Sequence, residues 1–430
     1  MSKRGRNGTL ALIASIALLF GLVSAAPAQD APAADDPFDT SAFDAATEGA
    51  AAGAGSAASG PGAVGQSTAA RVEYLVGGTA VASASAFAAP AFDGYAASSS
   101  LGGKVFAKVA VPDYGALYIS YNISQALFSG LSGAGKAALA PALDLSNPRY
   151  SLSELHYSLD FGKVLFVRAG KQLIAWGPSF VWTPVDFINL QKADAFASFD
   201  QRQGKPGLRL HLPLGKANAF AFADFSGLVS GGLTHDPLDT VNIAGRLDAI
   251  VGGFELGLTA FGGRNSQAKL GVDFSGDLLG FAAYGEVGLS PAYSSYEYAL
   301  RGSLGLSRSL GELRRWTVSA EAFYNSAGAD LGGNIPAMLA STPLYMGVWY
   351  AYAALEAREF LSPSLITKIS GLANFTDLSC RLELSETFDF PRAVPLTASL
   401  SWVGGGPGKE FTVLAGDGSF SLSVQTRFEF

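Results

Sequence analysis

The chain has 430 residues, of which 49% are hydrophobic and only 15% charged, and its formal net charge is -7 at pH 7. A soluble protein normally carries about 25% charged residues. An acidic balance argues against a nucleic-acid partner, which favours a basic surface. The single cysteine, Cys380, excludes an internal disulfide and a cysteine-based metal site, and we expect no cofactor.

Residues 1–28 predict a secretory signal peptide. Lys3, Arg4 and Arg6 form a basic region, residues 10–23 form an apolar region, and small residues at 24–28 provide a cleavage site. The alternative is a transmembrane anchor, but the apolar region is shorter than the roughly 20 residues that a helix needs to cross a bilayer. Without this segment the net charge becomes -7 - 3 = -10.

Residues 29–68 are dominated by Ala, Gly, Ser, Pro and Asp. Such a composition offers no apolar face for a core, so we expect a flexible periplasmic lead rather than a domain. A binding function of this lead in the periplasm is the alternative.

Residues 69–430 alternate between apolar and polar positions in short segments, and no run of 18 apolar residues follows the signal peptide. A membrane protein without spanning helices is a closed barrel, because backbone groups in lipid must be hydrogen-bonded internally. We therefore predict an all-β fold, a transmembrane antiparallel up-and-down β-barrel of about 18 strands, with a range of 16 to 18. The expected strands are 71–81, 102–111, 115–124, 150–161, 163–173, 206–214, 217–226, 240–250, 253–262, 267–274, 279–289, 296–307, 314–325, 348–360, 364–374, 377–388, 394–402 and 419–430.

The last of these segments fixes which face each strand presents. Its even positions from Phe420 to Phe430 are apolar or nearly so, while its odd positions are polar, which is a period of two. It resembles the C-terminal strand of bacterial outer-membrane proteins, in which a terminal Phe helps the assembly machinery to recognise the chain. The resemblance implies an outer-membrane location, with membrane lipid and, through Phe430, the barrel assembly machinery as partners.

The connections alternate between short and long. Counted back from a C-terminus in the periplasm, the periplasmic turns include 112–114, 162, 215–216, 252, 275–277, 311–312 and 362–363. The connections on the outer side are mostly long and include 125–149, 174–205, 227–239, 326–347 and 403–418. Short periplasmic turns and long outer loops are the rule for such barrels, and an even strand number puts both termini in the periplasm.

Charged residues fall on the alternate positions that would face the lumen. Arg246 and Asp248 oppose Leu247, for example. A charge that faces lipid at the midplane costs about 2 to 4 kcal/mol, so this sorting favours the barrel. Cys380 has lipid-facing parity, and so do Lys171 and Glu359, which fit only near strand ends. Aromatic residues with the same parity are expected at the rims, with Trp316 and Phe428 at the periplasmic rim and Trp349 and Trp402 at the outer rim.

The segment 169–209 and its flanks carry a second resemblance. The residues that form the pattern are Arg168, Gly170, Gln172, Trp176, Gly177, Pro184, Asp186 and Arg202. The pattern, Arg-x-Gly-x-Gln, Trp-Gly, Pro-x-Asp and a later Arg, resembles that of outer-membrane channel families related to alginate-export and similar substrate-specific porins. It covers about a tenth of the chain. The resemblance implies a porin-type channel and does not imply alginate as the substrate.

Within the outer loop 174–205, we expect the part from Trp176 to Arg202 to fold into the barrel and set its narrowest cross-section. Asp186 and Arg202 would tie it to the wall by charge-assisted hydrogen bonds. Whether this loop lines the pore and contacts solute or only closes the pore is left open. The residues expected to line the pore or its constriction are Arg168, Gln172, Trp176, Asp186, Arg202, Arg209, Arg246, Glu297, Arg301, Arg381 and Glu383.

A barrel of this size is too wide for strand side chains alone to fill. Because the lumen-parity charges are of mixed sign, we expect passive diffusion of small polar or weakly charged solutes. One alternative is a transporter of hydrophobic compounds, with residues 85–92 in an N-terminal hatch; another is a structural or adhesin-like barrel. A homo-oligomer is left open. His156, His211 and His235 show no companion catalytic motif, so we do not expect an enzyme.

Overall fold

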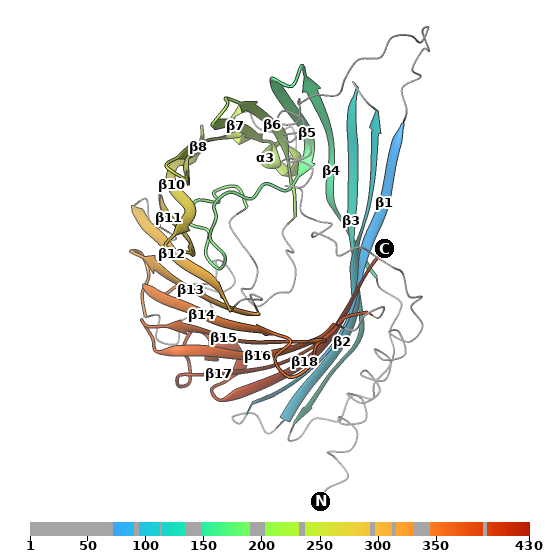
Figure 1. Ribbon diagram of the computed structural model, residues 1–430, viewed down its shortest axis with the longest axis vertical. Coiled ribbons are helices and arrows are strands. Elements are labelled where there is room, and N and C mark those ends of the chain that lie inside the picture. The colour runs from blue at the N-terminus through green and yellow to red at the C-terminus, as the bar shows by residue number, and fades with distance from the viewer. Residues whose placement is uncertain are drawn as a thin grey trace, which may run out of the picture.

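The computed structural model describes residues 72–89, 94–111, 114–133, 148–189, 203–231, 237–292, 297–311, 315–330, 345–389 and 394–430. They form an antiparallel barrel of 18 strands, in which each strand pairs with its neighbours along the chain (Figure 1). β1 and β18 also pair, from Thr79 with Glu429 to Ala88 with Phe420, and this ladder closes the barrel. The prediction of an up-and-down barrel of about 18 strands is confirmed.

The strands are β1 (Glu73–Ala89), β2 (Gly94–Val111), β3 (Gly115–Gly133), β4 (Arg149–Phe161), β5 (Leu165–Gln172), β6 (Lys205–Pro213), β7 (Ala217–Asp224), β8 (Asn242–Val251), β9 (Phe254–Gly263), β10 (Ser266–Leu278), β11 (Phe281–Pro291), β12 (Tyr298–Leu310), β13 (Trp316–Asn325), β14 (Trp349–Arg358), β15 (Leu365–Asn374), β16 (Ser379–Phe388), β17 (Leu396–Gly404) and β18 (Ser419–Glu429). Short helices lie between strands: α3 (Ser226–Gly231), η2 (Pro237–Thr240) and α5 (Thr412–Ala415). No helix in the described ranges is long and apolar enough to cross a membrane.

The two rims of the barrel differ. Gly78 and Phe430 exchange backbone hydrogen bonds of 2.9 and 3.1 Å, so β1 begins and β18 ends at one rim, here called the terminal rim. Its turns are tight, and residues such as Gly162 (φ 63°) and Gly252 (φ 61°) supply the positive φ that these turns need. The opposite rim, here called the loop rim, carries the long connections, including 173–204 and 405–418.

The first three strands are longer than predicted. The sequence pattern predicts a first strand that ends at residue 81, a second that begins at 102 and a third that ends at 124, whereas β1 to β3 have 17, 18 and 19 residues. The missed parts consist mostly of Ala, Ser and Gly, whose alternation has little hydrophobic contrast. They are held by the ladder and by cross-strand hydroxyl pairs, such as Ser83 with Ser100 at 2.8 Å. Residues 85–89 therefore belong to the wall and not to a hatch; residues 90–93 lie outside the described ranges.

One predicted turn is wrong. Residues 275–277 were expected to turn, but β10 continues to Leu278, and the chain reverses at Leu279 (φ 56°) and Gly280 (φ 79°). Gly276 lies inside the ladder, where a Cβ would meet the ring of Phe254 at 2.5 Å. The glycine there makes room for a cross-strand aromatic ring, which a sequence pattern does not distinguish from a turn.

The outward face of the barrel is apolar. Leu258, Leu304 and Leu382 are 52, 57 and 50% exposed, whereas the inward-facing Glu286 and Glu321 are each 2% exposed. Lys171 and Glu359, the two charged residues with lipid-facing parity, lie at strand ends. A charge that faces lipid costs little free energy there. Lys171, next to the last residue of β5, donates to the carbonyl of Leu152 at 2.6 Å, and Glu359, just after β14, pairs with Arg315 at 2.9 Å.

The four aromatic residues predicted for the rims lie near the ends of their strands. Trp316 begins β13 at the terminal rim, where its ring meets Phe360 edge to face with 5.2 Å between centroids, and Phe428 lies near the end of β18. Trp349 begins β14 at the loop rim, and Trp402 lies near the end of β17. Such rings suit the boundary between an apolar and an aqueous medium.

We predict that Cys380 contacts lipid when the barrel is in a membrane. It shares the outward face of β16 with Leu382 and Leu384, which are 50 and 41% exposed. A membrane-impermeant thiol reagent applied to intact membranes should therefore label Cys380 only after the membrane is dissolved with detergent. Rapid labelling in intact membranes would contradict both the face and the topology.

Candidate functional site

Residues 173–189, here called the inner loop, leave the end of β5 and run inside the ring of strands (Figure 1). Their backbone and side chains contact inward-facing residues of β7 to β15. The continuation of the connection, residues 190–202, lies outside the described ranges, and Arg202 with it.

One carboxylate on the wall binds the middle of the inner loop. Glu321 of β13 accepts hydrogen bonds from the backbone N–H groups of Phe180 at 3.0 Å, Val181 at 3.1 and 3.2 Å, and Trp182 at 2.9 Å. The Tyr284 hydroxyl donates to the same carboxylate at 3.1 Å. Successive backbone N–H groups that point at one anion form charge-assisted hydrogen bonds. Such bonds are stronger than those to a neutral acceptor.

A second wall carboxylate binds the inner loop on both sides of the segment 180–182. Glu286 of β11 accepts from the backbone N–H of Ser179 at 2.8 Å and from that of Val185 at 3.1 Å. The Ser179 and Ser303 hydroxyls also pair at 2.7 Å. Glu286 and Glu321 together, here called the carboxylate clasp, bind five backbone N–H groups of the inner loop.

A third carboxylate fixes the start of the loop. Glu154 of β4, 1% exposed, accepts from the backbone N–H of Leu173 at 3.0 Å and pairs with Lys104 at 3.1 Å. The inner loop is thus held at its start by one side of the barrel and in its middle by the other.

Glycines let the backbone of the loop come close to the wall. Gly271 of β10 and Gly288 of β11 are directly paired and both face inward. A Cβ on Gly288 would meet the carbonyl oxygen of Pro184 at 2.4 Å, and one on Gly271 would meet a methyl of Val185 at 2.6 Å. Gly177, at φ 99°, likewise has no room for a Cβ, which would lie 2.4 Å from the Glu286 carboxylate.

We predict that Gly288→Ala displaces the inner loop. The added methyl overlaps Pro184, and overpacking of this kind costs about 1–3 kcal/mol. Amide hydrogen exchange at Ser179 and Val185 should become faster, and ion conductance should rise. Gly245→Ala is the matched control, because a Cβ there has no neighbour closer than 3.8 Å. Equal exchange rates in the two variants would show that the close approach of the inner loop to Gly288 does not hold the loop in place.

Apolar side chains of the inner loop are buried against the wall in two groups. Ile174, Trp176, Phe187 and Ile188 pack against Phe222, Ala244 and Phe261 of β7 to β9. Val181 and Trp182 pack against Phe323, Tyr350, Tyr352 and Leu372 of β13 to β15. Trp182 is stacked on Phe323, with ring centroids 5.3 Å apart. Full burial of such a side chain contributes roughly 1.5–3 kcal/mol.

Two apolar residues of the segment differ from the rest. Phe180 is 48% exposed, unlike the other large apolar side chains of the inner loop, and Leu190 lies outside the described ranges. Asp186 is fully buried and accepts a hydrogen bond from the backbone N–H of Asn189 at 3.0 Å, which closes a turn within the inner loop. A contact from Asp186 or Arg202 to the wall stays a prediction.

Arg168 and Gln172 lie on the inward face of β5, beside the start of the inner loop. Arg168 pairs in register with Arg209 of β6 and donates to the Ser158 hydroxyl at 3.2 Å. The Gln172 amide, with no exposed surface, donates to the carbonyl of Arg168 at 3.2 Å. The geometry gives Gln172 a structural role in the wall.

The remaining predicted residues are dispersed around the barrel. Arg246 binds Asp248 at 2.7 Å and Asp273 at 2.7 and 2.9 Å. Arg381 pairs with Glu383 at 3.1 Å. Arg301 faces inward from β12 with a hydrogen bond to Ser290, and Glu297 is exposed at the loop rim just before β12. Glu286 and Glu321, which bind the inner loop, are not among the residues that the sequence predicted for the pore or its constriction.

At the loop rim, Glu410 joins the connection 405–418 to the barrel. Its carboxylate accepts from the backbone N–H groups of Tyr345 and Met346 at 2.8 and 3.2 Å, from the Tyr350 hydroxyl, and from the Asn374 amide at 2.7 Å. Tyr350 also borders Trp182, so this contact adjoins the packing of the inner loop.

We predict that the docking of residues 405–418 depends on pH. Burial raises the pKa of Glu410 above its ordinary value of 4.5, while the hydrogen bond from Tyr350 acts in the opposite direction. A raised pKa means that the docked state binds the proton more tightly. Docking is therefore strongest below that ordinary value and weakens as the pH rises through the raised pKa. Hydrogen exchange of residues 405–418, corrected for its intrinsic pH dependence, should show this in the native protein and not in Glu410→Gln. Stronger protection at high pH would contradict it.

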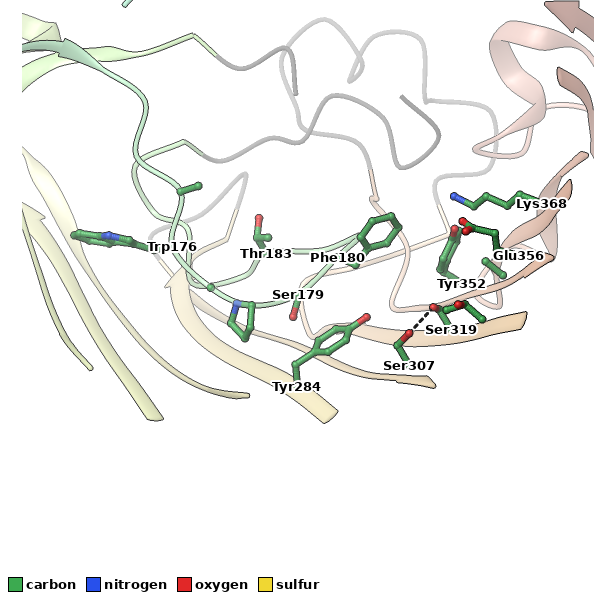
Figure 2. A pocket seen from close by; sticks show the side chains of 15 residues that line it. Trp176, Ser179, Phe180, Thr183, Tyr284, Ser307, Ser319, Tyr352, Glu356 and Lys368 are labelled. Carbon is green, nitrogen blue, oxygen red and sulfur yellow. Dashed lines mark hydrogen bonds between the residues drawn. The ribbon is translucent and has the colours of Figure 1, made fainter. Parts of the chain in front are cut away.

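A cavity of about 880 Å³ lies between the inner loop and the wall of β11 to β15 (Figure 2). The loop contributes residues 175–180 and Thr183, and the wall contributes mostly hydroxyl-bearing and aromatic side chains. Most of its wall residues, such as Thr317 near the start of β13 and Glu356 near the end of β14, belong to the half of the barrel next to the terminal rim.

No family model matches the chain, and no curated protein matches it. Solved structures from Pseudomonas aeruginosa do match. OprD gives a TM-score of 0.51 at 7% identity, over 83% of this chain and 95% of that chain. OccK7 (OpdD) gives 0.51 at 7%, over 83% and 99%, and OccK8 (OprE) gives 0.51 at 8%, over 83% and 98%. The chain shares their fold. At such low identity the likeness concerns the architecture alone.

Proposed function

We propose that the protein is an outer-membrane channel for the passive diffusion of small polar or weakly charged solutes, and that the inner loop sets its narrowest cross-section. The fold shared with OprD and the OccK proteins, which are outer-membrane porins, supports this proposal. The apolar outward face supports it independently, since a barrel with such a face is suited to lipid.

The observation that carries the proposal is the carboxylate clasp. A loop that served only to cover the outside of the barrel would not need buried carboxylates on the inner wall to bind its backbone. Five N–H groups of the inner loop bind Glu286 and Glu321 across the barrel interior. A loop held in this way reduces the open cross-section of the barrel, as a selective channel requires.

The pairing of charges on the inner wall favours solutes with little net charge. Arg246 is held between Asp248 and Asp273, and Arg381 pairs with Glu383. The clasp carboxylates are bound by backbone amides, so they do not form a ring of one sign that would select strongly for an ion.

Single-channel recording in planar bilayers tests the proposal. The purified protein should form pores of stable conductance, and liposomes that contain it should admit small polar solutes at rates that fall with solute size. A correctly folded barrel that gives no conductance would refute the channel. Uptake of apolar compounds without ion conductance would instead support a transporter of hydrophobic compounds. Recognition by the assembly machinery through Phe430 stays a prediction, homo-oligomer formation stays open, and we propose no catalytic activity.

A further inference from the structure

Hydroxyl-bearing side chains recur in the lining of the cavity beside the inner loop. Hydroxyl groups of Ser307 and Ser319 face each other at 2.9 Å on β12 and β13 (Figure 2). Tyr284, Tyr352 and Thr183 add further hydroxyls to the lining. A hydroxyl both donates and accepts, so a surface of hydroxyls matches a solute that itself carries many hydroxyls.

An aromatic ring stands at the same cavity. Phe180 is 48% exposed, while its neighbours Val181 and Trp182 are buried. Its backbone N–H binds Glu321, and its ring lies 5.9 Å from that of Tyr352, so its position is fixed from two sides. An exposed ring held in place offers its face to the C–H groups of a bound molecule, and a pocket with apolar faces and a few placed polar groups is typical of small-molecule sites.

The charges of the cavity compensate one another. Glu356 of β14 and Lys368 of β15 are direct neighbours in the ladder and both line the cavity. The Lys368 ammonium group lies 5.8 Å from the centroid of the Phe180 ring, and Glu356 accepts from Arg358 at 2.9 Å. Because the lining carries one charge of each sign, it favours neither an anion nor a cation.

We infer that this cavity is a binding site for neutral polyhydroxylated solutes of the size of a mono- or disaccharide, on the terminal-rim side of the constriction. The volume of about 880 Å³ lies within the range of roughly 300–1,000 Å³ that is usual for small-molecule sites. The inference rests on the proposed channel function, since the site would bind a sugar transiently while it crosses the channel.

Current recordings with sucrose as the probe test the site. Sucrose should reduce the ion current of single channels in a saturable way, at lower concentration when it is added from the terminal-rim side. A polyethylene glycol of the same hydrodynamic size should reduce the current without saturation, because it carries hydroxyls only at its two ends. Phe180→Ala should raise the half-saturating sucrose concentration about three- to tenfold.

Two further variants make the result specific. Phe420→Ala is the matched control, because Phe420 is 49% exposed on the outward face of β18 and the same substitution there should leave the sucrose block unchanged. Ser319→Ala removes one hydroxyl of the wall without changing the inner loop, and it should also weaken the block.

Three outcomes would overturn the inference. Equal, non-saturating effects of sucrose and polyethylene glycol on a conducting channel would show that there is no sugar site, while the channel itself would stand. Saturable block unaffected by both Phe180→Ala and Ser319→Ala would place the site elsewhere. The absence of any conductance would refute the proposed channel and the inference with it.

Discussion

Replacing residues 178–200 by a short Gly-Ser linker is expected to raise the single-channel conductance more than any other change described here. The linker removes the inner-loop residues that bind the clasp and those that fill the inner surface. Val185, Phe187 and Ile188 are each 2% exposed or less, and the glycines and serines of the linker have no apolar side chains to replace them. The strand ladder does not include this segment, so the barrel should still form.

Selectivity should change together with conductance. A wider cross-section admits larger solutes, so liposome swelling should extend to sugars that the native channel excludes. Folding can be checked independently from the retention of β-structure and resistance to unfolding in detergent. Native conductance of a folded variant would show that the inner loop does not set the narrowest cross-section.

Glu321→Ala is expected to release the middle of the inner loop and to increase conductance, though less than loop replacement. It leaves the N–H groups of Phe180, Val181 and Trp182 without their acceptor, and each unsatisfied buried group costs about 1–3 kcal/mol. The Trp182 packing on Phe323 opposes complete release. We therefore expect openings of intermediate, fluctuating conductance rather than one wide state.

A conservative variant and a control distinguish the effect of the Glu321 charge from the effect of losing its side chain. Glu321→Gln keeps an acceptor oxygen but loses the charge, so its conductance should lie between those of the native protein and Glu321→Ala. Glu255→Ala removes an exposed carboxylate near the start of β9, away from the inner loop, and should leave conductance unchanged. Native behaviour of Glu321→Ala would show that packing alone holds the loop.

The strands were predictable because a barrel wall imposes a strict period of two. Leu247 and Leu258 face outward and Arg246 faces inward, as their alternation in the sequence indicated. In the Ala-Ser repeat at 82–86 the two faces differ little in hydrophobicity, so the sequence does not predict the strand there. The backbone ladder with β2 nevertheless continues through these residues. The turn expected at 275–277 shows the complementary error, since a glycine was interpreted as a turn when it served as space for Phe254.

The sequence by itself determined the barrel, the order of its strands, the side on which the long connections lie and the segment that enters the interior. Only the tertiary structure decided what holds that segment. Asp186 was expected to act through its side chain, whereas the clasp is made by backbone N–H groups that bind Glu286 and Glu321, 101 to 141 residues away along the chain. Every non-proline residue carries such an N–H group, so no residue pattern marks the donors. Their acceptors are identified only when barrel closure brings them to the loop.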